Sequence, residues 1–324
     1  MRSERIEYFD IAKGIGIISV VVYHIAEIMG FRLIMEFVNT YFLSLFFFIS
    51  GYFVCGSSLK RLSLRVYVIK NSKHLLIPFF VIGLINNLWQ SVLFGSRGFI
   101  MIEDPKGGYW FLLVLFMFLV TLKILYDFLL SKIKHAVGHI LVLLIPFAIV
   151  IIASWYLSEQ IWAIMSLSSY RRYYLVFVVG FIIRELDVDL RNTYLKVLSA
   201  IGYIVVTLFF VHHMMNFSGN VDFALWLFTN VLGCLVFLSL SDYISKRFIS
   251  LGGAISQLGK VSLGIYVVHF FFKQFFNYLY DKFSLSSTCF LLLIAVVVVL
   301  VLSYAACILI KRSKMLSIIV MGGI

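Results

Sequence analysis

The chain has 324 residues, of which 62% are hydrophobic and 13% are charged. A soluble domain of this length is nearer half apolar and a quarter charged, so the composition excludes a water-soluble globular fold. The net charge is +12, but the basic residues lie between apolar blocks and do not form a patch interleaved with aromatic residues. This distribution is typical of topology signals in a membrane protein, and we expect no nucleic-acid partner.

The apolar residues occur in blocks of about twenty, the length that an α-helix needs to cross a bilayer. We therefore predict an all-α, polytopic membrane protein with about ten transmembrane helices. A single domain over residues 1–324, in a bacterial-type inner (plasma) membrane, is the simplest arrangement. The expected helices cover residues 9–30, 37–56, 75–95, 109–130, 139–157, 172–186, 196–214, 221–241, 258–280 and 288–310.

The lysines and arginines predict the orientation of these helices. With the N-terminus in the cytoplasm, 18 of the 27 fall on the cytoplasmic side and 7 on the other, while Lys13 and Lys123 lie within helices. Basic connecting segments favour the cytoplasmic side, so the bias predicts an N-in, C-in topology. Because every connecting segment is short, the helices and their ends must carry any chemistry.

The first expected helix carries four ionisable side chains in an apolar run, Asp10, Lys13, His24 and Glu27. At 100° per residue, His24 lies about 20° from Lys13 around the helix axis, with Asp10 about 60° to one side and Glu27 about 40° to the other. A stripe of this kind is too costly to face lipid, so we expect it to face the bundle interior or a wet cavity. Asp10 and Lys13 are also consistent with an anchoring pair at the helix end, and His24 with a packing residue.

Four segments, in order, resemble the acyltransferase 3 family of membrane O-acyltransferases, and in particular its fucose 4-O-acetylase-like branch. They read Asp10-Ile-Ala-Lys-Gly-Ile-Gly16 followed by His24, Leu45-Phe-Phe-Phe-Ile-Ser-Gly51, Tyr109-Trp-Phe-Leu112, and Leu258-Gly-Lys-Val-Ser-Leu-Gly-Ile-Tyr-Val-Val-His269. The resemblance extends over most of the chain. It implies an enzyme that acylates surface polysaccharides or related glycans.

Transfer of an acetyl group to a hydroxyl requires a base that works near neutral pH, and histidine has an ordinary pKa of about 6.5. We therefore expect His24 to be the catalytic base or a transient acyl acceptor, and the family resemblance implies the same role. Lys13 is expected to hold coenzyme A phosphates or to stabilise developing charge. Asp10 and Glu27 are expected to orient their neighbours, with structural pairing as the alternative.

Basic residues after the second expected helix are candidates for binding the acetyl-CoA donor. The family often carries an Arg-x-x-Arg pair in the cytoplasmic loop at this point, whereas this chain has Lys70-Asn-Ser-Lys73. The positive charge is preserved, but lysine lacks the planar fork that grips phosphate with two parallel hydrogen bonds. Lys70, Lys73 and Lys13 are the expected contacts to the donor.

Trp110, Tyr266 and His269 are candidates for binding the acceptor. Trp110 can stack on a sugar or coenzyme ring, although aromatic residues near a membrane face are also common as interfacial anchors. Ser262, Tyr266, His269 and Lys273 step by four, three and four residues, so they share one helix face. Tyr266 and His269 are equally consistent with hydrogen bonds to a partner helix. No C-x-x-C or Cys/His ligand spacing occurs, so we expect no metal site.

These observations predict a membrane-bound O-acyltransferase that uses acetyl-CoA to O-acetylate a cell-surface or lipid-linked polysaccharide. Its partners would be the acyl-CoA donor, a carbohydrate or glycolipid acceptor, and membrane lipids. The alternative is a transporter or flippase for lipid-linked glycans, in which the same stripe lines a passage. That alternative predicts internal repeats and paired broken helices, which the sequence does not show clearly.

Overall fold

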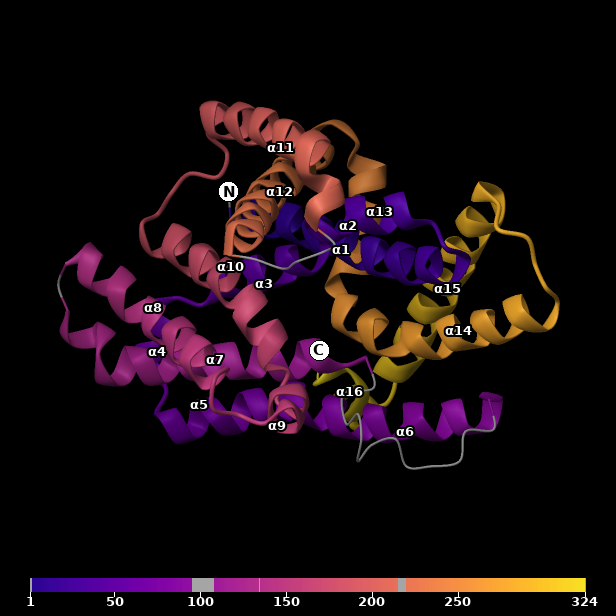
Figure 1. The fold of residues 1–324 in the computed structure, drawn as a ribbon, viewed down its shortest axis with the longest axis horizontal. Coiled ribbons are helices and arrows are strands. Elements are labelled where there is room, and N and C mark those ends of the chain that lie inside the picture. Colours follow the sequence, from indigo (N-terminus) through magenta and orange to yellow (C-terminus); the bar gives the residue numbers. More distant parts are fainter. Residues whose placement is uncertain (1, 95–107, 134, 215–219, 324) are drawn as a thin grey trace. The chain divides into compact units, whose positions relative to one another are not determined.

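A computed structural model describes residues 2–94, 108–133, 135–214 and 220–323 of the chain (Figure 1). The described residues form helices and contain no strand, which confirms the all-α prediction. They divide into two compact units. Unit 1 comprises residues 1–46 and 189–313, and unit 2 comprises residues 47–188 and 314–324. The single domain expected over residues 1–324 stays a prediction.

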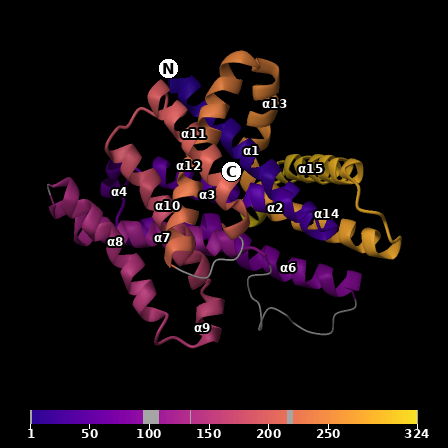
Figure 2. The same cartoon turned by 45° about the horizontal axis from the view of Figure 1, so that its top comes forward.

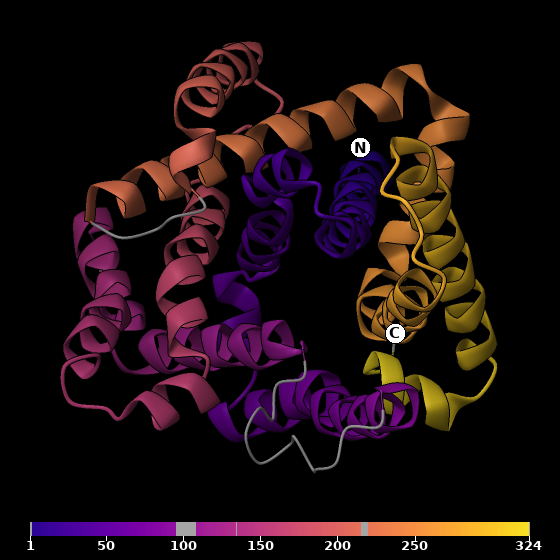
Figure 3. The same cartoon turned by 45° about the vertical axis from the view of Figure 1, so that its right-hand side comes forward.

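Unit 1 is built around the first helix, α1 (Arg2–Met29). The other helices of this unit are α2 (Arg32–Asn39), the first part of α3 (Phe42–Phe53), α11 (Thr193–Met214), α12 (Asn220–Arg247), α13 (Ile249–Lys260), α14 (Ser262–Lys282) and α15 (Cys289–Lys311). Helix α1 packs against α2, α12, α13, α14 and α15. Figure 2 shows α13 beside α1, and α12 is the long orange helix in Figure 3.

The two helices α1 and α13 approach each other closely through glycines. A Cβ atom at Gly14 would overlap the carbonyl oxygen of Ile255, and a Cβ atom at Gly259 would overlap that of Asp10. Small residues allow two helix backbones to touch in this way. These contacts therefore fix where α13 lies along the first half of α1.

The chain bends by 78° between α13 and α14, at Val261. The backbone amide of Val261 donates to the carbonyl of Leu258 and so closes the end of α13. The helix expected over 258–280 is therefore α14 with a later start, at Ser262, and residues 258–260 end α13, a helix that was not predicted. The helix expected over 37–56 lies mostly in the candidate span Arg32–Phe53, which has one interruption. Its two parts are α2 and α3, which meet at Thr40 and Tyr41.

The second half of α1 is held by an apolar core against α15. Its buried members are Val21, Ile25, Ala26, Met29, Leu292, Ala295, Val296 and Val299. Residues four apart share one face of a helix, so the face of α1 that carries Val21, Ile25 and Met29 packs against this core. The side chains of His24 and Glu27 are left to face α14.

Unit 2 contains the rest of α3 and the helices that follow it. They are α4 (Gly56–Arg61), α5 (Leu64–Asn71), the π-helix η1 (Ser72–Leu76), α6 (Ile77–Phe94), α7 (Trp110–Phe128), the 3₁₀-helix η2 (Leu130–Lys132), α8 (Ala136–Ala153), α9 (Glu159–Ile164), α10 (Leu167–Glu185) and α16 (Lys314–Met321). Phe47, Phe118 and Phe177 pack together in its core, with ring centroids 5.1–5.3 Å apart. Gly51 and Gly180 allow α3 and α10 to touch backbone to backbone.

Six helical segments among the described residues are long and apolar enough to cross a membrane, or seven if the bent pair α13–α14 is one span. The six are Glu7–Met29, Arg32–Phe53, Leu64–Leu93, Trp110–Lys132, Asp222–Arg247 and Cys289–Lys311. Two further apolar helices, Val137–Ala153 and Thr193–Leu208, are shorter. The count of ten and the N-in, C-in orientation stay predictions.

Candidate active site

His24 and Glu27 form a hydrogen-bonded pair on α1. The Nδ1 atom of His24 lies 3.2 Å from Oε2 of Glu27. An ionised carboxylate can only accept, so Nδ1 carries the proton of this hydrogen bond. In the neutral imidazole, the lone pair is then on Nε2. This arrangement gives an oriented histidine with a basic nitrogen directed away from its carboxylate partner.

Lys273, on the neighbouring helix α14, contacts the Glu27 side of this pair. Its Nζ atom lies 3.1 Å from the same Glu27 oxygen that faces His24. The side chains of His24 and Lys273 are each 20% exposed, whereas that of Glu27 is 45% exposed. Glu27 therefore joins α1 to α14 at the edge of the site, and the His24 ring lies deeper. The sequence predicts that Lys273 shares a helix face with Tyr266 and His269, but it does not predict the contact with Glu27.

His269 lies fully buried beside His24. The centroids of the two imidazole rings are 5.5 Å apart, and Phe270 lies 5.1 Å from His24. The Nδ1 atom of His269 is 2.7 Å from the carbonyl oxygen of Tyr266 and 3.1 Å from that of Ile265. Because both partners are acceptors, Nδ1 carries the proton. The Nε2 atom is buried without a hydrogen-bond partner among the described residues.

The bend at Val261 brings these two helices together. Helix α13 lies along the first half of α1, and the 78° turn directs α14 past the second half. His269 and Lys273 therefore reach His24 and Glu27 from a segment about 246 residues away in the sequence. Tyr266 is on the same face of α14, 7% exposed, with its ring 6.0 Å from His269.

Asp10 and Lys13 form a second pair nearer the start of α1. Lys13 donates to Asp10 over 3.1 Å, and Asp10 is buried against the backbone of Gly259. Eleven residues separate Lys13 from His24, which corresponds to about 16 Å along a helix. The structure therefore divides the predicted stripe into two pairs and does not bring Lys13 into contact with His24.

Lys70 and Lys73 lie in unit 2 and are not in a loop. Lys70 is in the last turn of α5, and Lys73 is in the π-helix that joins α5 to α6. Pro78 lacks the amide N–H that would donate to the carbonyl oxygen of His74 in an α-helix, so the regular α-helical hydrogen bonds are interrupted here. The expected loop is therefore wrong, and the expected helix 75–95 begins instead at Leu64 as part of a longer helical run.

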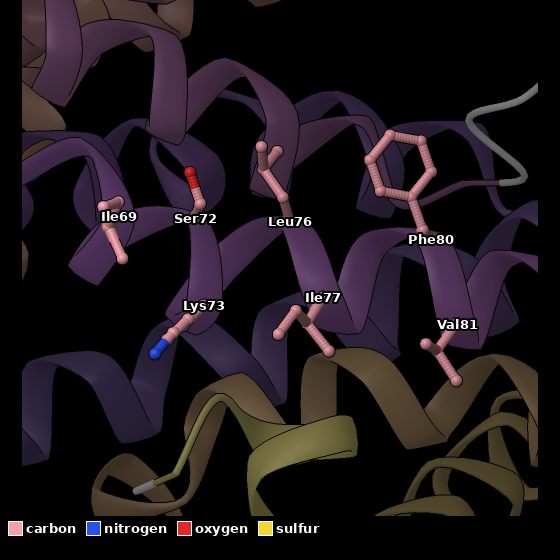
Figure 4. Close-up of a pocket in the computed structure, with 7 residues that line it drawn as sticks. All are labelled: Ile69, Ser72, Lys73, Leu76, Ile77, Phe80 and Val81. Carbon is pink, nitrogen blue, oxygen red and sulfur yellow. The ribbon is translucent and has the colours of Figure 1, made fainter. Parts of the chain in front are cut away.

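A shallow groove of about 350 Å³ runs along this helical segment, with Lys73 on its lower side (Figure 4). The other lining side chains are nearly all apolar. The full set is Ile69, Ser72, Lys73, Leu76, Ile77, Phe80 and Val81. Lys70 is exposed and does not line the groove.

Trp110 is the first residue of α7 in unit 2. Its ring stacks on that of Tyr173 with centroids 5.7 Å apart and an angle of 26° between the planes. One face of the indole is therefore occupied by the protein, and only the other face remains for a ligand. Within the described parts of the chain, no group of three or more His, Cys, Asp or Glu side chains has the arrangement to hold a metal ion.

A family model described as an acyltransferase domain, acyltransferase 3, matches residues 6–312. The chain belongs to this family. The match confirms the acyltransferase 3 resemblance, while the fucose 4-O-acetylase-like branch stays a prediction. Neither the curated proteins nor the solved structures contain a match to the chain.

Membership of the acyltransferase 3 family makes the protein a membrane acyltransferase, with an acyl donor and an acceptor as its substrates. The apolar helices agree with this assignment and indicate a multi-pass membrane protein. The match runs through α1 and α14, so both histidines of the candidate site lie within the acyltransferase domain.

Proposed function

We propose that this acyltransferase is an O-acetyltransferase of a bacterial-type inner membrane, with acetyl-CoA as donor and a cell-surface or lipid-linked polysaccharide as acceptor. The observation that supports this most is the orientation of His24 by Glu27 in the second half of α1, which is otherwise largely apolar. Ionisable side chains are rare within membrane helices and mark functional sites there.

In the proposed reaction, Nε2 of His24 removes the proton from the acceptor hydroxyl as the oxygen attacks the thioester carbonyl. The C–O bond forms, the C–S bond breaks, and the thiolate of coenzyme A leaves and takes up a proton. Glu27 holds the imidazole in the correct tautomer and balances the charge that His24 gains. Lys273 holds Glu27 in place through their 3.1 Å contact.

The remaining candidate residues take supporting roles in this proposal. The buried Nε2 atom of His269, which has no hydrogen-bond partner among the described residues, accepts a hydrogen bond from the acceptor sugar, and Tyr266 lies on the same helix face. Lys13, held by its partner Asp10, attracts the phosphates of the donor at the start of α1. The roles of Trp110, Lys70 and Lys73, which lie in unit 2, stay predictions from the sequence.

The test uses membrane vesicles with radiolabelled acetyl-CoA, and counts label in the glycan fraction. We expect His24→Ala to lose transfer and His135→Ala, a change at an exposed histidine in unit 2, to keep it. Mass spectrometry of surface glycan from cells with and without the gene should differ by one acetyl group. Wild-type glycan transport without transfer from any acyl donor, or full activity of a folded His24→Ala variant, would refute the proposal.

A further inference from the structure

A cluster of three cations surrounds one buried carboxylate in unit 1, away from the His24 site. Asp242, near the end of α12, is 3% exposed. Lys196 of α11 and Lys246 of α12 donate to its Oδ2 atom over 2.7 and 2.8 Å. Arg191, just before α11, places Nε 3.4 Å from Oδ1. With three positive charges and one negative charge, the cluster carries a net charge of +2.

The three cations have more hydrogen-bond donors than the single Asp242 carboxylate can accept. Arg191 makes an ion pair with Oδ1 of Asp242 but no hydrogen bond, since that oxygen has no hydrogen-bond partner among the described residues. A guanidinium group has five N–H donors, and an ammonium group has three. The side chains remain reachable from outside, with Lys246 58%, Arg191 34% and Lys196 25% exposed.

The cations are also held in place before any ligand arrives. The guanidinium of Arg191 lies over the ring of Tyr8, 5.3 Å from its centroid. Lys196 and Lys246 share a single oxygen, so their two ammonium groups must lie within about 5.5 Å of each other. Like charges at this separation repel; the shared Asp242 oxygen offsets part of that repulsion, and a second anion would offset more of it.

From this arrangement we propose that Arg191, Lys196 and Lys246 form a phosphate-binding site, with Asp242 as the residue that positions them. The four side chains carry a surplus of two positive charges. The Asp189 carboxylate, which accepts from the backbone amide of Arg191 over 2.9 Å, reduces this surplus, and the positive charge that remains suits an anionic phosphate group. Arginine presents its fork to the phosphate oxygens, and the lysines add point charges.

The distance to His24 agrees with a donor that carries its phosphates at one end and its thioester at the other. Tyr8, which lies under Arg191, is 16 residues before His24 on α1, or about 24 Å along the helix axis. The extended pantetheine arm of a coenzyme A thioester has a comparable reach. This choice of ligand rests on the proposed function, whereas the phosphate site itself does not. The other source of phosphate is the headgroup of an anionic lipid, since basic pockets at helix ends bind such lipids.

The experiment measures binding and needs no acetyl transfer. The protein is placed in nanodiscs of zwitterionic lipid, and the dissociation constants of coenzyme A and dephospho-coenzyme A are measured at two salt concentrations. We expect Arg191→Gln/Lys246→Gln to weaken coenzyme A binding about 10- to 100-fold, and to reduce its dependence on salt. Lys246→Gln alone, at the most exposed of the three positions, keeps the Lys196–Asp242 pair and should weaken binding several-fold.

Arg312→Gln is the matched control, because Arg312 is an exposed cation of unit 1 with no recorded contact to Asp242, and it should leave the affinity unchanged. Bound phosphatidylglycerol, counted by native mass spectrometry, forms a second arm. Loss of coenzyme A affinity assigns the site to the donor, and loss of the lipid alone assigns it to a headgroup. Unchanged binding of both in the folded double variant would overturn the proposal. Coenzyme A binding without any acetyl transfer would instead remove the proposed function and leave the phosphate site standing.

Discussion

Gly259→Ala tests whether the contact between α13 and α1 positions the site. A Cβ atom at Gly259 would overlap the carbonyl oxygen of Asp10, and the amide nitrogen of Gly14 is also close. Both neighbours are backbone atoms, so no side chain can rotate away, and the helices must separate by more than about 1 Å to restore contact distance. Overpacking of this kind costs about 1–3 kcal/mol, and the rigid surroundings place this case near about 3 kcal/mol.

Gly253→Ala provides the matched control in the same helix. Nothing lies within 4 Å of a Cβ atom at Gly253, so alanine adds only its higher helix propensity, about 0.5–1 kcal/mol of stabilisation. In thermal unfolding in detergent at a fixed scan rate, Gly259→Ala should lower the Tm by roughly 6–12 °C, and Gly253→Ala should raise it by roughly 1–4 °C. Acetyl transfer should fall only in Gly259→Ala, because α14 continues from α13. Equal Tm values and rates for the two variants would refute the reasoning.

Four further predictions concern other features of the molecule. Glu27→Gln should lower the rate of acetyl transfer about tenfold, because a half-exposed charge-assisted hydrogen bond contributes about 1.4 kcal/mol; an unchanged rate in folded protein would remove Glu27 from the mechanism. Lys123 is 1% exposed and donates to Asp127 and to the carbonyl of Leu59. Lys123→Met should therefore lower the stability of unit 2 by about 2–3 kcal/mol, because it leaves the Asp127 carboxylate unpaired. In thermal unfolding, Lys123→Met/Asp127→Asn should recover part of this loss. Hydrogen bonds from Ser57 and Ser58 lower the pKa of Cys55, so its thiolate fraction rises at lower pH than that of an ordinary cysteine, and Ser57→Ala should shift its maleimide-labelling profile to higher pH. In the N-in orientation, an impermeant maleimide added to intact cells should label Cys289 and spare Cys55; the reverse pattern would show that the orientation is wrong.

Hydropathy was sufficient to locate most of the helices, because long apolar runs have few alternatives in a membrane protein. It did not predict the two breaks, since neither contains proline. The break at Thr40 is stabilised by tertiary contacts, in which the threonine hydroxyl bonds the carbonyl of Phe37 and the hydroxyl of Tyr203.

The part of the candidate site that lies on α1 could be predicted from the sequence, and the contact between α1 and α14 could not. Helical spacing along α1 placed His24 and Glu27 on one stripe, and a pair three residues apart is local enough to be seen in the sequence. The sequence also drew attention to the face of α14 that carries His269. It gave no sign that this face meets α1, because the contact between Glu27 and Lys273 depends on the packing of helices remote in the chain.

Small changes in the bend at Val261 produce larger displacements farther along α14. Lys273 lies 11 residues beyond the start of α14, about 16 Å from the bend, so a change of only about 5° in the bend angle would move its backbone by about 1.4 Å. That displacement is large compared with the 3.1 Å contact between Lys273 and Glu27, so either the lysine side chain must adjust or the contact lengthens. In the proposed mechanism, substitutions around Val261 would therefore affect His24 through Glu27 without contacting the histidine.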